Sequence, residues 1–317
     1  MYEQLQQLDT IRINFTADGM HIINIVLGLV MFGVALNIKP SLFKRVLTHP
    51  KSVILGVVSQ IIILPAVTFL LIMLFNRFLS PMVAMGMLLV AACPGGNISN
   101  FMSAISKGNI ELSVTLTAIS TAICPLATPA NFAFWGWLYV RLVNNGAIGA
   151  LQELQIDTVA MFESMMLLLA LPLALGMLTA HYLPKVTEKI KKAFQILSII
   201  FFVLMVVLAF SNNFDLFIKY IGYIAIIVFV HNGCALATGY GLGTFFRLPH
   251  PDRRSLTVEI GIQNSGLGLV LLFNPKIFPP DLAIGGMLFV TAWWGVWHIL
   301  SGLAVSGWFA ARSKRAV

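Results

Sequence analysis

The chain has 317 residues, of which 58% are hydrophobic and only 10% are charged, and its mean hydropathy is +0.90. A soluble domain carries about 25% charged residues, so this composition excludes an ordinary soluble protein and indicates a chain whose solvent is lipid. The net charge of +8 does not indicate a nucleic-acid partner, because the basic residues lie in short segments between apolar runs.

Nine apolar stretches follow one another along the chain, and each is expected to be a transmembrane helix. They are of membrane-spanning length and lack the strict alternation of barrel strands, and only helices or closed barrels satisfy their backbone groups in lipid. The stretches comprise approximately residues 20–38, 52–76, 80–106, 109–139, 158–183, 193–214, 216–246, 255–275 and 279–311. The sequence therefore predicts an all-α polytopic membrane protein with nine transmembrane helices.

Lysine and arginine residues are concentrated in alternate connecting segments. If residues 1–19 lie outside, fifteen of the 20 basic residues fall in segments on the cytoplasmic side and five fall in segments outside. This distribution follows the rule that cytoplasmic loops carry the excess of positive charge. We therefore expect an extracytoplasmic N-terminal segment, residues 1–19, and a cytoplasmic tail, residues 312–317.

Two of the nine stretches carry glycines and polar side chains near the middle of the predicted membrane. In the stretch 80–106, residues 94–100 read PGGNISN, and in the stretch 255–275, residues 259–266 read EIGIQNSG. Glycine and proline loosen a helix, and the backbone groups that they free must find other partners. We therefore expect both helices to be broken.

The two breaks occupy corresponding places in two halves, residues 20–139 and 158–311, which would cross the membrane in opposite directions. The first half has four predicted helices and the second has five. Paired broken helices in inverted repeats mark the substrate and ion site of secondary transporters. A channel can also use irregular backbone, but the inverted repetition favours alternating access.

Glu259 is the chief candidate for a functional residue, because it lies within a predicted span directly before the second break. An ionised carboxylate in a membrane needs a cation or hydrogen-bond donors, and the inner parts of the predicted spans contain no Lys or Arg. A metal cation or a proton is therefore the expected partner. Oxygen groups suit a hard cation. Those near the breaks or on neighbouring helices belong to Gln60, Ser99, Asn100, Ser113, Thr117, Gln263, Asn264 and Ser265, with the backbone carbonyls of Ile260 and Ile262.

Histidines and tryptophans within the spans leave two interpretations open. His231 and His298 are either core histidines with internal hydrogen bonds or members of a proton relay. Trp293, Trp294 and Trp297 either pack in the interior or wall a pocket. The chain has no nucleotide-binding loop and no paired catalytic residues, so we expect neither an enzyme nor a cofactor. Transport would then draw on an ion gradient.

These motifs are similar to those of the bile acid:sodium symporter family, and in particular to its nine-span bacterial bile acid and pantoate symporters. The resemblance is carried by Cys93-Pro94-Gly95-Gly96 with Ser99-Asn100, and by Leu256-Thr257-Val258-Glu259-Ile260-Gly261 with Gln263-Asn264-Ser265-Gly266. It implies crossing broken helices in a core domain formed by the second to fourth and seventh to ninth spans. The first, fifth and sixth spans would form a panel domain.

The resemblance also implies two sodium sites and an anion site. By motif, the first sodium site would use Ser99, Asn100, Ser113, Thr117 and Glu259. The second would use Gln60, Glu259 and Gln263 with the carbonyls of Ile260 and Ile262. The substrate would contact Asn97, Asn264, Ser265 and His298. Asn97 and Ile299 depart from residues common in relatives, so the substrate is less determined than the use of sodium.

The sequence thus predicts a sodium-coupled symporter of an organic anion, either bile acid-like or a small carboxylate such as pantoate. Sodium, the anion and the lipid bilayer are the expected partners, and the plasma membrane, as a bacterial inner membrane, is the expected location. Two alternatives remain. A proton-coupled carrier would use Glu259 and the histidines, and replacing sodium by choline would identify it. A ligand-binding channel or sensor would fail a counterflow assay.

Overall fold

The computed structural model describes residues 1–10, 17–38, 50–143, 163, 166–211, 214–274, 277–279 and 282–314. Within these ranges the chain is helical, and its only extended pairing is an isolated antiparallel bridge between Gly95 and Gln263. The predicted all-α class is therefore confirmed for the described residues. The start of the predicted span 158–183 and the last residues of the tail lie outside them.

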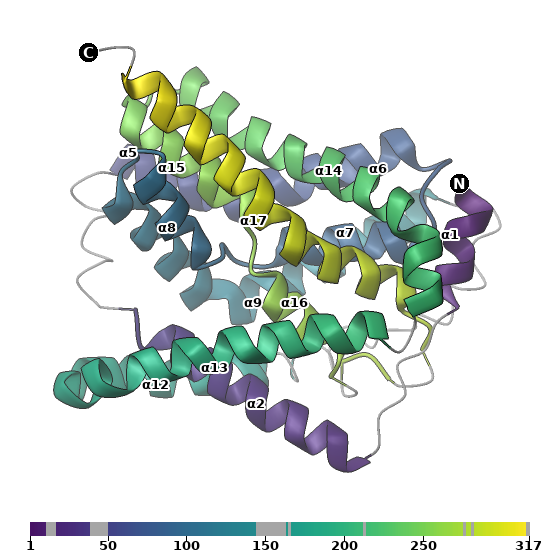
Figure 1. Ribbon diagram of the computed structural model, residues 1–317, viewed down its shortest axis with the longest axis horizontal. Coiled ribbons are helices and arrows are strands. Elements are labelled where there is room, and N and C mark those ends of the chain that lie inside the picture. Colours follow the sequence, from purple (N-terminus) through teal and green to yellow (C-terminus); the bar gives the residue numbers. More distant parts are fainter. Residues whose placement is uncertain are drawn as a thin grey trace.

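Figure 1 shows the helices in their arrangement. In chain order they are α1 (Tyr2–Asp9), α2 (Ala17–Ala35), α5 (Pro50–Val58), η1 (Ser59–Ile63), α6 (Leu64–Phe75), α7 (Pro81–Ala92), α8 (Ile98–Ile105), α9 (Ile110–Leu142), η2 (Met166–Ala170), α12 (Leu171–Tyr182), α13 (Pro184–Ser211), α14 (Phe214–Phe245), α15 (His250–Gly261), α16 (Ser265–Leu272) and α17 (Gly285–Lys314). The segments η1 and η2 are π-helical.

Four helical segments of the described chain are long and apolar enough to cross a membrane. They comprise Pro50–Phe75, Ile110–Leu142, Ile218–Phe245 and Gly285–Ser313. Large apolar side chains such as Leu74 and Phe245 are exposed on the outer surface, whereas Gln60 and Glu259 are buried. Such extensive exposed apolar surface is unusual for a soluble protein and fits a lipid environment. The chain is thus a multi-pass membrane protein, and the count of nine spans stays a prediction.

Helix boundaries differ from the apolar stretches mainly at polar ends. Helix α13 begins at Pro184 and α15 begins at His250, in both cases several residues before the apolar stretch. Hydropathy detects only the part of a helix that lies in hydrocarbon, so helical turns in the polar interface escape it. Helix α1 was not expected, because its residues are mostly polar, but Leu5 and Leu8 are fully buried beneath it.

The two expected breaks are present and face each other. Residues 93–97 separate α7 from α8, and residues 262–264 separate α15 from α16. The backbone N–H of Gly96 donates to the carbonyl of Ile262 at 2.8 Å, and that of Asn264 donates to the carbonyl of Pro94 at 2.8 Å. The backbone groups freed by one break are therefore satisfied by the other, as lipid burial requires.

Glycine permits this close approach of two backbones. A Cβ at Gly96 would lie 3.0 Å from the carbonyl oxygen of Gln263, and a Cβ at Gly95 would collide with the carboxylate of Glu259. Any larger residue would push the two breaks apart. The Pro-Gly-Gly run thus serves the contact between the halves as well as the interruption of the helix.

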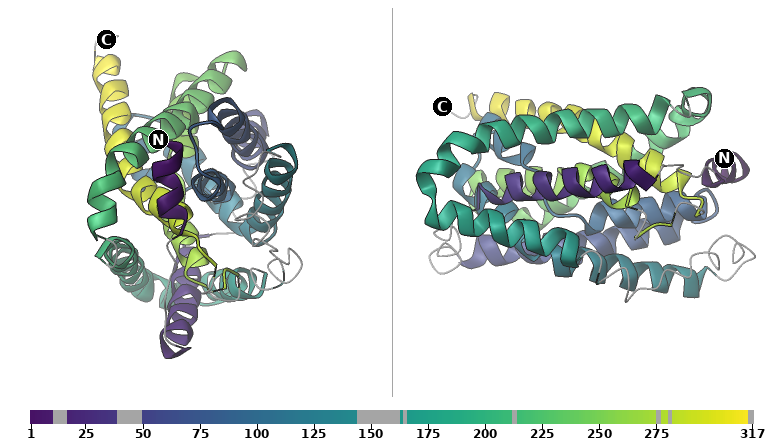
Figure 2. Two further views of the ribbon diagram at one scale, coloured as in Figure 1. Left: turned by 90° about the vertical axis from the view of Figure 1, so that its right-hand side faces the viewer. Right: turned by 90° about the horizontal axis from the view of Figure 1, so that it is seen from below.

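The broken helices lie among the best-buried elements. Every residue of α7 is buried, and α7 packs against α9 and α17. Helices α2, α12 and α13 pack together on another side of the molecule, away from α7 (Figures 1 and 2). These three helices correspond to the first, fifth and sixth predicted spans. Their assignment to a separate panel domain stays a prediction.

Candidate functional site

Glu259 lies in the last turn of α15, and three hydroxyl groups surround its carboxylate. Ser99 Oγ donates to Oε2 at 2.6 Å, Ser113 Oγ donates to Oε2 at 3.0 Å, and Thr117 Oγ1 donates to Oε1 at 2.7 Å. The Glu259 side chain is only 1% exposed. Among the described residues, no Lys, Arg or His forms an ion pair with it. The carboxylate is thus solvated by hydroxyl groups alone.

Local sequence explains how these groups come together. Ser113 and Thr117 are four residues apart on α9 and share one face of that helix. Asn109 fixes the start of α9, because its side chain accepts a hydrogen bond from the N–H of Leu112 at 3.1 Å. Ser99 lies in the first turn of α8, directly after the first break. The break therefore turns this hydroxyl toward Glu259.

Asn100 completes the group that the sequence predicted as the first sodium site. Its Oδ1 accepts a hydrogen bond from Thr117 Oγ1 at 3.4 Å. The structure therefore brings all five of these residues together in one hydrogen-bonded cluster, which we call the carboxylate cluster (Ser99, Asn100, Ser113, Thr117 and Glu259). Ser120, on the same helix, was not singled out by the sequence, and its Oγ accepts a hydrogen bond from the N–H of Gly95 at 3.3 Å.

The residues predicted for the second sodium site are only partly brought together. Gln60 Nε2 donates to Gln263 Oε1 at 2.5 Å and to the carbonyl of Cys93 at 3.0 Å. Gln263 Nε2 donates to the carbonyl of Ile260 at 2.9 Å. We call these three residues, Gln60, Ile260 and Gln263, the amide cluster. The described hydrogen bonds do not join Glu259 to it, and the carbonyl of Ile262 instead accepts the N–H of Gly96.

Gln60 owes its position to a local change in helix type. It lies in the π-helical segment η1, and Pro65 follows in the first turn of α6. Proline lacks an N–H and disturbs the regular hydrogen bonds of the preceding turn. Single turns of π-helix are frequent at functional sites, where they redirect side chains. The π-helical turn therefore coincides with the residue whose amide points into the protein interior, Gln60.

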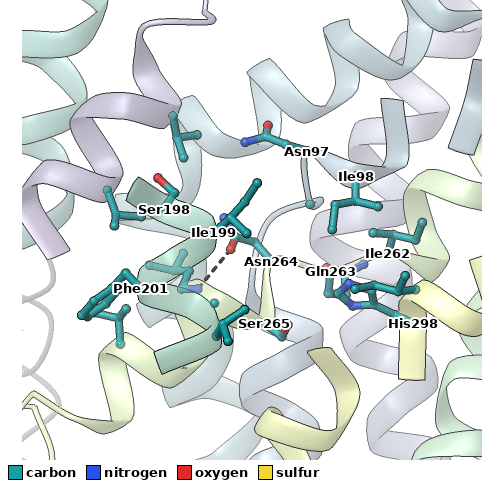
Figure 3. Close-up of a pocket in the computed structure, with 18 of the residues that line it drawn as sticks. Asn97, Ile98, Ser198, Ile199, Phe201, Ile262, Gln263, Asn264, Ser265 and His298 are labelled. Atoms are coloured by element: carbon teal, nitrogen blue, oxygen red, sulfur yellow. Dashed lines mark hydrogen bonds between the residues drawn. The ribbon is translucent and has the colours of Figure 1, made fainter. Parts of the chain in front are cut away.

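A cavity of about 340 Å³ lies beside the crossing of the broken helices (Figure 3). All four predicted substrate residues line it, together with Ser198, Ile199, Phe201 and Val203 of α13 and Val30, Met31 and Val34 of α2. Within the described part of the chain, no charged side chain lines its wall. The cavity thus combines an apolar wall from α2 and α13 with a polar wall at the breaks.

The four predicted residues differ in how free their polar groups are. Asn264 Oδ1 accepts a hydrogen bond from the N–H of Leu267 at 3.0 Å and so caps α16. His298 is buried, and its Nδ1 has no hydrogen-bond partner among the described residues. Asn97 is exposed to the cavity at the start of α8. The contribution of α13 to the wall could not be predicted, because its apolar residues resemble lipid-facing ones.

His231 lies away from this cavity. Its Nε2 is 2.8 Å from Thr68 Oγ1, and its ring lies 4.6 Å from that of Trp294, measured between centroids. Trp294 is fully buried. None of the three tryptophans at 293, 294 and 297 is among the residues that line the cavity. The contacts of His231 and Trp294 are therefore those of interior packing.

Comparisons with known proteins identify the family of the chain. A family model described as the Sodium Bile acid symporter family matches residues 24–220. An uncharacterized sodium-dependent transporter, YocS, of Bacillus subtilis (strain 168) is 31% identical over 293 residues, which are 92% of this chain and 84% of that protein. The chain belongs to the sodium bile acid symporter family. The resemblance found in the sequence motifs is thereby confirmed.

Further relatives in this family are longer proteins. The probable sodium/metabolite cotransporter BASS2, chloroplastic, of Oryza sativa subsp. japonica is 28% identical over 277 residues, and the match covers 84% of this chain and 62% of that protein. Sodium/bile acid cotransporter 4 of Homo sapiens is 27% identical over 272 residues, and the match covers 84% of this chain and 59% of that protein. The family to which the chain belongs is thus one of sodium-dependent transporters, not of enzymes.

Proposed function

We propose that the chain is a secondary active transporter that carries an organic anion together with sodium ions by alternating access. The observation that carries this proposal is the carboxylate cluster. A carboxylate buried in the membrane interior with only neutral hydroxyl donors is costly to keep ionised, so a cation is its natural partner. Sodium dependence in the names of the relatives supports the choice of ion.

The ligand chemistry of the cluster supports a hard cation. Its side chains offer hydroxyl, amide and carboxylate oxygens, which suit alkali and alkaline-earth ions. Among the described residues, no group of three or more His, Cys, Asp or Glu side chains could hold a metal ion. A transition-metal site is therefore not favoured. The hydroxyls that now donate to Glu259 would turn their lone pairs toward the ion.

We place a second sodium ion at the amide cluster. The side-chain oxygens of Gln60 and Gln263 and the carbonyl of Ile260 lie within one network there. Glu259 and the carbonyl of Ile262 belong to the adjoining turns of the same broken helix, so a small rotation of the Gln263 side chain would let the ion reach them. Two sodium ions would act as coupling ions, and no further cofactor is needed.

The cavity supports an anion with an apolar body. Its volume of about 340 Å³ suits a small organic molecule. The N-termini of α8 and α16 meet at its polar wall, and helix N-termini favour negative charge. We propose that the anionic group lies near Asn97, Asn264, Ser265 and His298, and that the body lies against α2 and α13. A bile acid-like molecule or a small carboxylate such as pantoate meets this description.

The expected topology belongs to the same proposal. Residues 1–19 would lie outside, the tail would lie in the cytoplasm, and nine helices would cross a bacterial inner membrane. Labelling of single cysteines introduced at the exposed positions Gln6 and Arg312 with an impermeant reagent tests the orientation. Labelling of both positions from the same side would contradict an odd number of spans.

Uptake into proteoliposomes tests the proposed function. Labelled organic anions should accumulate with external sodium and not with external choline at constant pH. Accumulation that persists in choline and responds to a pH gradient would identify a proton-coupled carrier instead. Counterflow should also occur, since trapped unlabelled anion accelerates entry of labelled anion only in a carrier. Its absence for an anion that binds would identify a channel or a sensor.

A further inference from the structure

A second, much smaller cavity adjoins the carboxylate cluster. It has a volume of about 30 Å³, which is enough for one water molecule or one ion. It lies between the C-terminal end of α2 with the residues just after it, the start of α8 and the first third of α9. The residues that line it are Val34, Asn37, Ile38, Asn97, Asn100, Val114, Thr117, Ala118 and Thr121. We call it the α9 chamber.

The hydroxyl of Thr121 lines this chamber and has no hydrogen-bond partner in the described part of the chain. Threonines within helices usually donate to the carbonyl four residues earlier, and on α9 Thr115 does so at 2.7 Å. Thr121 is 1% exposed, yet its Oγ1 has no hydrogen bond among the described residues. The carbonyl that it would use, that of Thr117, accepts from Ser120 instead. A buried hydroxyl left in this state is available to a ligand.

The chamber is continuous with the carboxylate cluster through shared residues. Ser113, Thr117 and Thr121 are spaced by four residues and form a ladder of hydroxyls along one face of α9. Thr117 donates to Glu259 at 2.7 Å and also lines the chamber, as does Asn100. An ion that leaves the Glu259 carboxylate on this side would therefore pass Thr117 and Asn100 and then meet Thr121.

The polar groups of the chamber are neutral. They belong to Asn37, Asn97, Asn100, Thr117 and Thr121, and among the residues that the structure describes no charged side chain lines the wall. Such a wall can replace part of the water shell of a sodium ion but attracts it less than the ionised carboxylate does. These properties suit a place that an ion passes through more than one where it stays.

We propose that the α9 chamber is the passage by which a sodium ion reaches and leaves Glu259, with the Thr121 hydroxyl as a ligand on the way. This inference rests on the proposed sodium coupling. It assigns Thr121, which no motif singled out, to the transport cycle. A passage alters the rate at which an ion binds, whereas a ligand of the bound ion alters the equilibrium, and this difference makes the proposal testable.

The test is a sodium concentration jump on the full-length protein in proteoliposomes on a solid-supported membrane. Sodium binding moves charge, so the decay of the current gives the binding rate, and its amplitude against sodium concentration gives the half-saturation. Thr121→Val removes the hydroxyl with little change in shape. We expect it to slow the decay at least threefold and to change the half-saturation less than twofold. Thr115→Val is the matched control, since Thr115 is buried on the same helix but outside the chamber.

Each outcome decides the matter. Wild-type rates in Thr121→Val would contradict the passage and leave the chamber as a place for structural water. A shift of half-saturation by twofold or more would make Thr121 a ligand of the bound ion, which also contradicts it. If Thr121→Val does not fold, Ala118→Val narrows the same chamber and should slow the decay likewise. A wild-type protein without any sodium-dependent current would instead refute the proposed function itself.

Discussion

The carboxylate cluster and the amide cluster both lie beside the crossing of the broken helices but differ in chemistry. In the first, hydroxyls from α8 and α9 converge on the single charged group, at 2.6, 3.0 and 2.7 Å. In the second, two neutral amides bond mainly to each other and to backbone carbonyls. Both clusters depend on the end of α15, since Glu259 lies in its last turn and Gln263 lies two residues beyond it.

The difference in charge between the two clusters indicates how strongly each of them contributes to sodium binding. The carboxylate cluster carries a full charge that its neutral surroundings do not balance, so it needs a cation more strongly. The amide cluster is already satisfied internally, and a cation there must first break the bond between Gln60 and Gln263. We therefore expect the charge of Glu259 to dominate sodium affinity and the amides to adjust it.

Removal of that charge should have the largest effect. Glu259→Gln keeps the shape of the side chain and should reduce sodium-driven uptake to the level of liposomes without protein. The reason is that no other ionisable group of the carboxylate cluster can attract the ion. Uptake in sodium and in choline measures the effect, and Glu111→Gln, at the exposed start of α9, is the control. Sodium-dependent uptake that survives in Glu259→Gln would contradict the claim that the carboxylate cluster dominates sodium binding.

Charge counting gives the next prediction. If both clusters hold sodium, two positive charges balance Glu259 and a monovalent anion, and the loaded site is close to neutral. Glu259 stays with the protein, so each cycle carries one net positive charge inward. A potential of 100 mV, negative inside, then adds about 2.3 kcal/mol to accumulation. A valinomycin-imposed potential should accelerate uptake of a monocarboxylate. Uptake that ignores the potential would mean that only one cluster holds sodium.

Substitution within the amide cluster should have a smaller effect. Gln263→Ala removes one ligand and should raise the sodium half-saturation about tenfold, which corresponds to about 1.4 kcal/mol. Anion affinity at saturating sodium should change little. Asn97→Ala should do the reverse, because Asn97 lies outside both clusters. Gln263 also lines the large cavity, but its amide is engaged by Gln60 and by the carbonyl of Ile260. Titrations of sodium and of the anion on both variants measure these affinities. Equal losses of sodium affinity in the two variants would show that the ion site and the anion site are not separate.

The smallest expected effect concerns Asp9 of α1, which belongs to neither cluster, and the pH dependence of stability. The carboxylate of Asp9 accepts hydrogen bonds from Ser80 Oγ at 2.9 Å and from the N–H of Met82 at 3.1 Å, at the start of α7. Burial raises the pKa of Asp9 to about 7, although these two hydrogen bonds oppose the change. The folded protein therefore binds this proton more tightly than the unfolded chain does.

The sign of the pH effect follows from that difference. The stabilisation by protonated Asp9 is complete below pH 4 or so and is lost as pH rises toward 7, by at most about 1.4 kcal/mol per pH unit. Thermal unfolding between pH 4 and pH 8 should show this slope in the wild type and a weaker one in Asp9→Asn. Sodium affinity of the variant should stay at the wild-type value. A large loss of sodium affinity would mean that α1 acts on the clusters.

Sequence reasoning reached the carboxylate cluster because its signals are local. A lone acid before a helix break, and hydroxyls four residues apart on α9, are visible in the printed chain, and the structure brings Glu259, Ser113 and Thr117 together. Backbone pairing between the breaks was not predicted, because it depends on the distance between residues far apart in sequence. Thr121 could not be distinguished from other helical threonines either. Ser120 donates to the carbonyl of Thr117, which Thr121 would otherwise use, and this contact is visible only in the structure.

The apolar wall of the large cavity marks another limit. Phe201 and Val203 of α13 have the composition of lipid-facing residues, and a hydropathy pattern does not distinguish a side chain that faces lipid from one that faces a cavity. The short helix α1 was missed for a related reason. Its two buried leucines are too few to produce a periodic signal, and their burial depends on α7, α14 and α17.

Equilibrium binding of labelled sodium to the purified protein tests the central claim most directly, because it requires no knowledge of the anion. The account predicts saturable binding that choline does not displace, approaching two ions per chain, and loss of that binding in Glu259→Gln while Glu111→Gln binds as the wild type does. Sodium binding of equal amount and affinity in the wild type and in Glu259→Gln would contradict the claim that this buried carboxylate holds the coupling ion.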